Sequence, residues 1–426
     1  MSKVYKYETG AKLIYKKNDI NSTTAIKIVF ECGSRCDGEL AGLAHFCEHM
    51  FFSGTKTENK QEITKQYFDF INVNAYTNSQ EVLFMGEIFT KELPDYLKLV
   101  SKMITQSTFS TANVESEKKV VLQEIVADSD DYGLKAVREF TYWLMDKDYY
   151  RKGVLGNEKS VKAITSKDVK NFVKKYFIAN NCSVFVVSPM PFKKVKKLVE
   201  QELLLKLKVD NKFLPLPYDA DKVVDTNIAE LKNAKIDKNF LHIGFKVNLG
   251  TDNLKRLYTA YALCAIMSNT SQGVLKKLRL EKGLVYSAYI FLNDNKYDSA
   301  LIFKTELGKA NIKECINIFA DYIKELINNG ISQELLEQYL RETKYYHESK
   351  VVSPKTLINE IFNIKRFGRV VTDEERYKYR INVKKADIDA LIKEIFNDTN
   401  IICSIYGDAK KTDVYTIKEL KEKFNF

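Results

Sequence analysis

The apolar residues of the chain follow helical and strand periods in turn. Val169, Val173 and Phe177 have the spacing of one face of a helix, and the short β-branched run 182–187 that follows them is typical of a buried strand. In the segment 26–30, apolar residues at every second position indicate a further strand. The pattern therefore predicts a protein of the α+β class.

The same pattern returns in the second half of the chain, which indicates an internal duplication. A displacement of 219 positions aligns the helix and strand at 168–186 with a second helix and strand, and a displacement of 217 aligns the strand at 26–33 with 243–250. The matched pairs include Asp168 and Asp387, Val169 and Ile388, Val173 and Ile392, Phe177 and Phe396, and Gly33 and Gly250. Chance similarity between two helix–strand units is the alternative to a duplication.

The duplication predicts two similar domains, each made of a sheet with helices. A chain of 426 residues also exceeds the length at which a single core stops growing, about 250–300 residues. We expect an N-terminal domain over 1–205, a linker over 206–227 that holds two of the six prolines, and a C-terminal domain over 228–426.

Composition and charge exclude several classes of protein. The net charge is +11, but the lysines are interleaved with acidic residues along the whole chain, so we expect no nucleic-acid binding. No window approaches 18 uncharged apolar residues, and the first ten residues do not resemble a secretory signal, so we expect no membrane association and a cytoplasmic location. The seven cysteines are scattered without a CxxC pair, as in a reducing compartment, and we expect Cys47 and most of the others to be buried.

Two of the four histidines, His45 and His49, stand four positions apart. On a helix this spacing places both imidazoles on one face, where they can reach one metal ion. Glu48 projects to the same side and can accept a proton from a water on the metal. A catalytic zinc site also needs a third protein ligand and an open position.

A helix predicted at 115–125 offers the best candidate for the third ligand. Val114, Val121 and Ile125 can pack inward, while Glu117 and Glu124, seven positions apart, lie on one face two turns from each other. This spacing suits one ligand and a second carboxylate behind it. Solvated glutamates on a helix surface are the alternative.

At this point the sequence resembles a known family. The segment 33–55, which contains H-F-C-E-H, is similar to the inverted zinc-motif peptidases of the pitrilysin and insulinase family, which includes the mitochondrial processing peptidases. The similarity extends to the motifs at 74–77, 119–124 and 153–156 and to the strand at Cys182. It also implies two similar α+β halves in one chain.

The resemblance implies a role for each residue of the predicted metal site. In that family the third ligand is the second glutamate of an E-x6-E pair, and Glu124 follows His49 by 75 positions. His45, His49 and Glu124 would then hold one Zn²⁺ per chain, with Glu48 as general base. Glu117 would orient a ligating histidine from behind.

The resemblance also implies residues that bind the substrate. Asn74 and Ala75 would lie on an edge strand to which an extended peptide can add itself. Arg279 and Tyr286, seven positions apart, match a pair that binds substrate carbonyls and the developing oxyanion. From the residues alone, 74–77 is a strand beside a turn, Arg279 is a surface charge and Tyr286 is a core aromatic.

The function that these features predict is a zinc-dependent endopeptidase that hydrolyses short or unfolded peptides within a closed chamber. Short members of the family form such a chamber from two chains, and this chain has both the zinc motif and the arginine–tyrosine pair. We therefore expect a homodimer, with a heterodimer with a related chain as the alternative. A non-catalytic peptide-binding or supporting subunit of a processing peptidase is the competing function.

Overall fold

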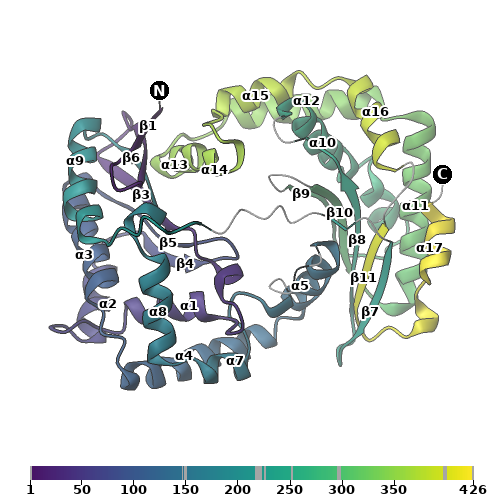
Figure 1. Cartoon of the computed structure of the whole chain (residues 1–426). Helices are drawn as coiled ribbons and strands as arrows, with labels where there is room; N and C mark the ends of the chain where they lie inside the picture. Colours follow the sequence, from purple (N-terminus) through teal and green to yellow (C-terminus); the bar gives the residue numbers. More distant parts are fainter. Residues whose placement is uncertain are drawn as a thin grey trace. The chain divides into compact units, whose positions relative to one another are not determined.

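The chain folds into two compact units that each contain one sheet (Figure 1). The computed structural model describes residues 2–145, 147, 151–215, 223–224, 227–250, 253–294, 299–396 and 401–424. The first unit draws on positions 1–131, 152–219 and 351–371, and the second on 132–151, 220–350 and 372–426. No helix in the described parts of the chain is long and apolar enough to cross a membrane.

The first unit contains a six-stranded sheet in the order β1-β2-β6-β3-β5-β4. Its strands are β1 (Ser2–Lys6), β2 (Lys12–Lys17), β3 (Thr23–Phe30), β4 (Val73–Thr77), β5 (Val82–Phe89) and β6 (Cys182–Ser188). Its helices are α1 (Leu43–Phe51), α2 (Lys60–Phe68), α3 (Leu93–Gln106), α4 (Thr111–Ser129), α7 (Glu158–Ala163), α8 (Ser166–Tyr176), α9 (Phe192–Glu202), α13 (Pro354–Phe362) and α14 (Ile364–Phe367).

The second unit contains a five-stranded sheet in the order β7-β11-β8-β10-β9. Its strands are β7 (Ile228–Asn233), β8 (Asn239–Val247), β9 (Ala288–Asp294), β10 (Ser299–Leu307) and β11 (Ile401–Gly407). Its helices are α5 (Tyr132–Met145), α10 (Leu254–Met267), α11 (Ile312–Asn329), α12 (Gln333–Glu348), α15 (Asp373–Ile381), α16 (Lys385–Ile395) and α17 (Ile417–Phe424), with a π-helix at Lys276–Glu281.

The two sheets confirm the predicted duplication and the α+β class. Strands β2-β6-β3-β5-β4 of the first sheet correspond in order to β7-β11-β8-β10-β9 of the second. Among these five matched strands, the first pair of each sheet is parallel and the other three pairs are antiparallel. Two copies of one fold therefore account for both units.

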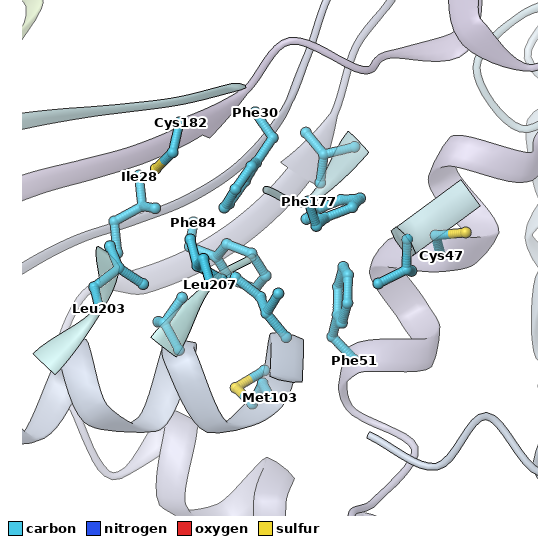
Figure 2. Close-up of a cluster of buried hydrophobic side chains, with 14 of the residues drawn as sticks. Ile28, Phe30, Cys47, Phe51, Phe84, Met103, Phe177, Cys182, Leu203 and Leu207 are labelled. Carbon is cyan, nitrogen blue, oxygen red and sulfur yellow. The ribbon is translucent and has the colours of Figure 1, made fainter. Parts of the chain in front are cut away.

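The main core of the first unit lies between one face of its sheet and helices α1, α3, α8 and α9 (Figure 2). Alternation along β3 directs Ile26, Ile28 and Phe30 to this face, as the strand pattern predicts. The Phe177 ring lies 4.7 Å from the rings of both Phe30 and Phe51, so it joins the sheet to α1. This packing fixes the height of α1 above the sheet.

A helix from the second half of the sequence covers the opposite face of the first sheet. Ile358 and Ile361 of α13 pack there against apolar side chains that include Val29. At the edge of this contact, Lys16 Nζ lies 2.5 Å from a carboxylate oxygen of Glu360. The sheet is therefore buried on both faces, and α13 belongs to the first unit although it follows α12 in sequence.

The second unit likewise contains a helix from the first half of the sequence. Helix α5 follows α4 in sequence but packs through Phe140 and Leu144 against β10 and β11. Gly244 of β8 makes room for this helix, because a Cβ there would lie 2.9 Å from the Phe140 ring. The linear boundary at 206–227 stays a prediction, and its residues 216–222 and 225–226 lie outside the described chain.

We expect Ile361→Ala to lower the free energy of unfolding by about 2–4 kcal/mol, since removing a buried side chain of this size leaves a cavity. Ile361 is fully buried under the first sheet. Urea titration followed by circular dichroism measures the change. Val352→Ala, in the same segment but at an exposed position, is the control and should change stability by less than about 0.5 kcal/mol. Equal stabilities of the two variants would contradict the assignment of α13 to this core.

Candidate metal centre

The start of α1 is held by a buried carboxylate. Gly42, at the N-cap, has a φ of 91° and no side chain that could cap the helix. The backbone N–H groups of Gly42 and Ala44 instead donate to Asp37 at 2.7 and 2.8 Å. Burial raises the pKa of Asp37 to about 7 despite these bonds. Asp37 therefore supplies the helix cap that the local sequence lacks.

Helix α1 turns its apolar face to the core and its histidines to the site. Phe46, Cys47 and Met50 have no exposed surface, and burial raises the pKa of the Cys47 thiol well above its usual value. The rings of His45 and His49 lie on the other side, with centroids 4.6 Å apart. The helical spacing thus places the two imidazoles together and sends Cys47 into the core, as predicted.

Glu124 of α4 completes a cluster with the two histidines. Its Oε2 lies 3.8 Å from His45 Nε2 and 3.5 Å from His49 Nε2. One ligand atom from each residue lies within 4.8 Å of the others, and no other such group of three occurs among the described residues. Two imidazole nitrogens and a carboxylate oxygen that converge in this way match the donor set of a catalytic zinc site.

The protonation of the histidines also suits a metal. Burial, followed by the neighbouring His49, lowers the pKa of His45 to about 3, so this imidazole is neutral near pH 7 and keeps a lone pair for a metal. Burial disfavours the charged form of His49 as well. The hydrogen bond with Glu117 and the charges of Glu124 and Glu48 outweigh burial and raise the pKa of His49. A cation among these groups would balance the negative charges of Glu48, Glu117 and Glu124.

Glu117 lies behind His49 and is almost fully buried. Its Oε1 is 3.0 Å from His49 Nδ1, while its Oε2 is 2.6 Å from Lys60 Nζ. Burial opposes the charged form of Glu117, but these two partners outweigh it and lower its pKa. An anionic Glu117 accepts a hydrogen bond from Nδ1–H of His49, which leaves Nε2 free to face Glu124.

Glu48 lies next to this cluster and is buried, with 8% of its surface exposed. Thr77 Oγ1 of the edge strand β4 donates a 2.7 Å hydrogen bond to Glu48 Oε2. Burial raises the pKa of Glu48, and the charge of Glu124 adds to this effect. A carboxylate with a raised pKa and one oxygen held in place suits a general base.

Three of the four residues with predicted roles in substrate binding are exposed, whereas Ala75 is partly buried against the core. Asn74 and Ala75 belong to β4, which is the edge strand of the first sheet. The Ala75 N–H donates to Asn74 Oδ1 at 3.0 Å. In the second unit, the Arg279 guanidinium lies 5.2 Å from the centre of the Tyr286 ring, and Tyr286 is 83% exposed. Tyr286 is therefore not the core aromatic that its local sequence suggests.

The sequence alone assigns no role to three residues of the site, which are Asp37, Lys60 and Thr77. Thr77 falls within the N-A-Y-T segment at 74–77, so the motif contains it without giving it a role. Lys60 is one of many lysines, and nothing in the spacing relates it to Glu117. Both contacts join elements far apart in sequence and become visible only in the folded chain.

The corresponding place in the second unit has different chemistry. Helix α10 follows β8 and contacts the edge strand β9, as α1 follows β3 and contacts β4. Helices α10, α12 and α15 bound a cavity of about 310 Å³. Its lining includes Tyr261, Ala265, Tyr339, Glu342, Tyr346 and Tyr377. Among the described residues of this unit, no histidine–carboxylate cluster could hold a metal.

The described residues combine a duplicated α+β fold with one His–His–Glu cluster, an arrangement that suits a two-domain metallopeptidase. Residues 12–157 match the family model described as Insulinase (Peptidase family M16), and residues 163–343 match the model described as Peptidase M16 inactive domain. The chain belongs to this insulinase family, which confirms the resemblance.

Individual relatives agree with this assignment. An uncharacterized zinc protease of Rickettsia bellii is 25% identical over 414 residues, which cover 93% of this chain and 95% of the relative. The mitochondrial-processing peptidase subunit beta of Rattus norvegicus is 25% identical over 177 residues, 40% of this chain and 35% of that subunit. The crystal structure of a Helicobacter pylori protease has a TM-score of 0.82 with 19% identity, and the match covers 96% of this chain and 99% of that one.

We expect Glu124→Ala to reduce the zinc that purified protein retains to a small fraction of the wild-type content, because the cluster loses its only carboxylate. Elemental analysis after dialysis measures the loss. Glu115→Ala on the same helix is the matched control, since Glu115 pairs with Lys118 at the surface. Unchanged zinc content in Glu124→Ala would mean that another side chain provides the third ligand.

Proposed function

We propose that the protein is a zinc-dependent endopeptidase that hydrolyses short or unfolded peptides, with His45, His49 and Glu124 as the zinc ligands. The observation that carries this proposal is the convergence, within 4.8 Å, of ligand atoms from His45 and His49 of α1 and from Glu124 of α4, next to Glu48 of α1. Two relatives are named as zinc proteases, which supports zinc as the metal. We expect one zinc ion per chain.

The chemistry divides between the metal and the protein. A zinc ion with three protein ligands lowers the pKa of a water to about 7 and polarises a carbonyl group. Glu48 takes the proton of the attacking water and passes it to the departing amine. Thr77 holds one oxygen of Glu48, which leaves the other for this transfer. Hydrolysis then needs no covalent enzyme intermediate.

Edge-strand pairing accounts for a broad choice of peptides. Asn74 and Ala75 lie on β4, where an extended peptide can add itself as a further strand. Main-chain pairing of this kind tolerates many side chains. Arg279 and Tyr286 offer a cation and a phenol next to each other on an exposed surface, and both can donate to substrate carbonyls and to the developing oxyanion.

A homodimer is the assembly that we propose, in which the zinc site of one chain works with Arg279 and Tyr286 of its partner. The presence of both sets of residues in one chain supports it. A heterodimer with a related chain is the alternative, since relatives include a protein named as a subunit and a structure of Complex III2 from Candida albicans. The cytoplasmic location stays a prediction.

A non-catalytic peptide-binding or supporting subunit is the competing function. The complete set of His45, Glu48, His49 and Glu124 argues against it, because a binding subunit needs neither ligands nor a base. Incubation with fluorogenic peptides, with and without a chelator, separates the two functions. Absence of cleavage at every zinc concentration would favour the supporting subunit.

We expect Glu48→Gln to retain zinc and to lose at least about 100-fold in kcat, because the amide cannot accept the proton of the attacking water. Zinc content and peptide turnover are measured on the same preparation. Glu39→Gln, at an exposed position outside the cluster, should behave as the wild type. Turnover of Glu48→Gln near the wild-type rate would remove Glu48 from its role.

We expect Glu48→Gln and Arg279→Ala, each nearly inactive alone, to recover activity when mixed under conditions of subunit exchange. In a mixed dimer, one of the two sites combines an intact Glu48 with an intact Arg279 from the other chain. Random exchange within two-fold dimers then restores about a quarter of wild-type turnover. A mixture that stays inactive although the chains exchange, as shown by differently labelled subunits, would place both residues of a site in one chain.

A further inference from the structure

Lys60 is the least expected partner of the candidate metal centre. Its Nζ lies 2.6 Å from Glu117 Oε2, while Glu117 Oε1 lies 3.0 Å from His49 Nδ1. The Glu117 side chain is 3% exposed and the Lys60 side chain is 48% exposed. The lysine therefore reaches inward from the surface to the one carboxylate oxygen that His49 does not use.

The position of Lys60 in α2 gives no local reason for a lysine. It is the first residue of the helix, directly after the N-cap Asn59. A cation at a helix N-terminus is unfavourable, because the peptide dipoles place partial positive charge there. The capping box between Asn59 and Glu62 already satisfies the helix start. The favourable interaction of the Lys60 ammonium group is thus its contact with Glu117.

The geometry makes Glu117 a rigid link between Lys60 and His49. A carboxylate that is bound at one oxygen can still rotate, whereas one bound at both oxygens is fixed in plane and position. A fixed Oε1 holds the Nδ1–H of His49, and with it the direction of Nε2, which faces Glu124 at 3.5 Å. Removing a partner of this kind behind a histidine ligand typically weakens metal binding about 10–100-fold.

We propose that Lys60 is a positioning residue of the metal centre, which fixes the His49 ring through Glu117. This inference rests on the proposed zinc site. The contact of Lys60 with the site is its ion pair with Glu117, so it acts through another residue. Substitution of Lys60 should therefore weaken zinc binding more than it lowers the turnover per bound zinc.

The test compares zinc affinities in competition with a chelator of known affinity. We expect Lys60→Met to weaken zinc binding at least about 10-fold, in the range found when such supporting partners are removed. Lys60→Arg, which keeps a cation that can reach Glu117, should recover most of the loss. Lys65→Met is the matched control, since Lys65 is exposed on the same helix. Thermal unfolding of the zinc-free proteins checks that all variants fold alike.

A double-mutant cycle with Glu117→Gln tests the route of the effect. We expect Lys60→Met to add little to the loss that Glu117→Gln causes alone, because the link is already broken. Wild-type affinity in Lys60→Met, or a full further loss in the double variant, would overturn the proposal. Failure of the wild-type protein to bind zinc would instead overturn the metal centre itself, and that result is separate from the behaviour of Lys60.

Discussion

The packing of α1 against α4 is the constraint on which the candidate site depends. Val114 and Val121 are fully buried in the core that α1 also enters, so the two helices cannot slide past each other without exposing apolar surface. Glu117 lies on the same helix, about one turn from each of these valines, and its buried carboxylate bonds to His49. An unpaired carboxylate in this position would be costly, which gives the helix contact one favoured register. Glu124, two turns further along α4, then falls next to both imidazoles.

The duplication shows how one scaffold can carry two kinds of surface. Both copies have the same order of strands and an equivalent helix beside the edge strand, so the fold does not require the metal ligands. The second copy has four tyrosines around its cavity, together with Glu342, His347 and Asp373, and its described residues include no group that could hold a metal. It also presents Arg279 and Tyr286 on a separate exposed segment. The residues that stabilise the fold thus differ from the residues at the metal centre and at the cavity. The surface chemistry of each copy can therefore change without a change of fold.

Much of this arrangement could be predicted from the sequence, and the remainder has physical reasons. Helical spacing placed His45, Glu48 and His49 on one helix because that relation is local. Spacing alone offers Glu117 and Glu124 as one ligand and a carboxylate behind it, with solvated glutamates as the alternative, and the family resemblance assigns the ligand role to Glu124. The sequence does not predict that α5 packs in the second unit and α13 in the first. An apolar helix face indicates burial but not which sheet the helix covers. The exposure of Tyr286 is also not predicted from the sequence. An aromatic residue prefers the interior on average, but local sequence does not show that the folded segment around Tyr286 is exposed.

The three carboxylates around the histidines illustrate how surroundings divide one chemical group into several roles. Glu117 is buried and bonded at both oxygens, so it can orient a neighbour but has no free oxygen for a metal or a water. Glu48 is buried with one oxygen held by Thr77, and burial raises its pKa, as proton transfer near neutral pH requires. Glu124 has 42% of its side chain exposed, the most of the three, so the cluster opens to solvent on its side. A catalytic metal must keep one position open, and an exposed ligand leaves room for a water and for the carbonyl of a peptide. The same side chain on two adjoining helices can therefore be a support, a base or a ligand, according to what else each carboxylate touches.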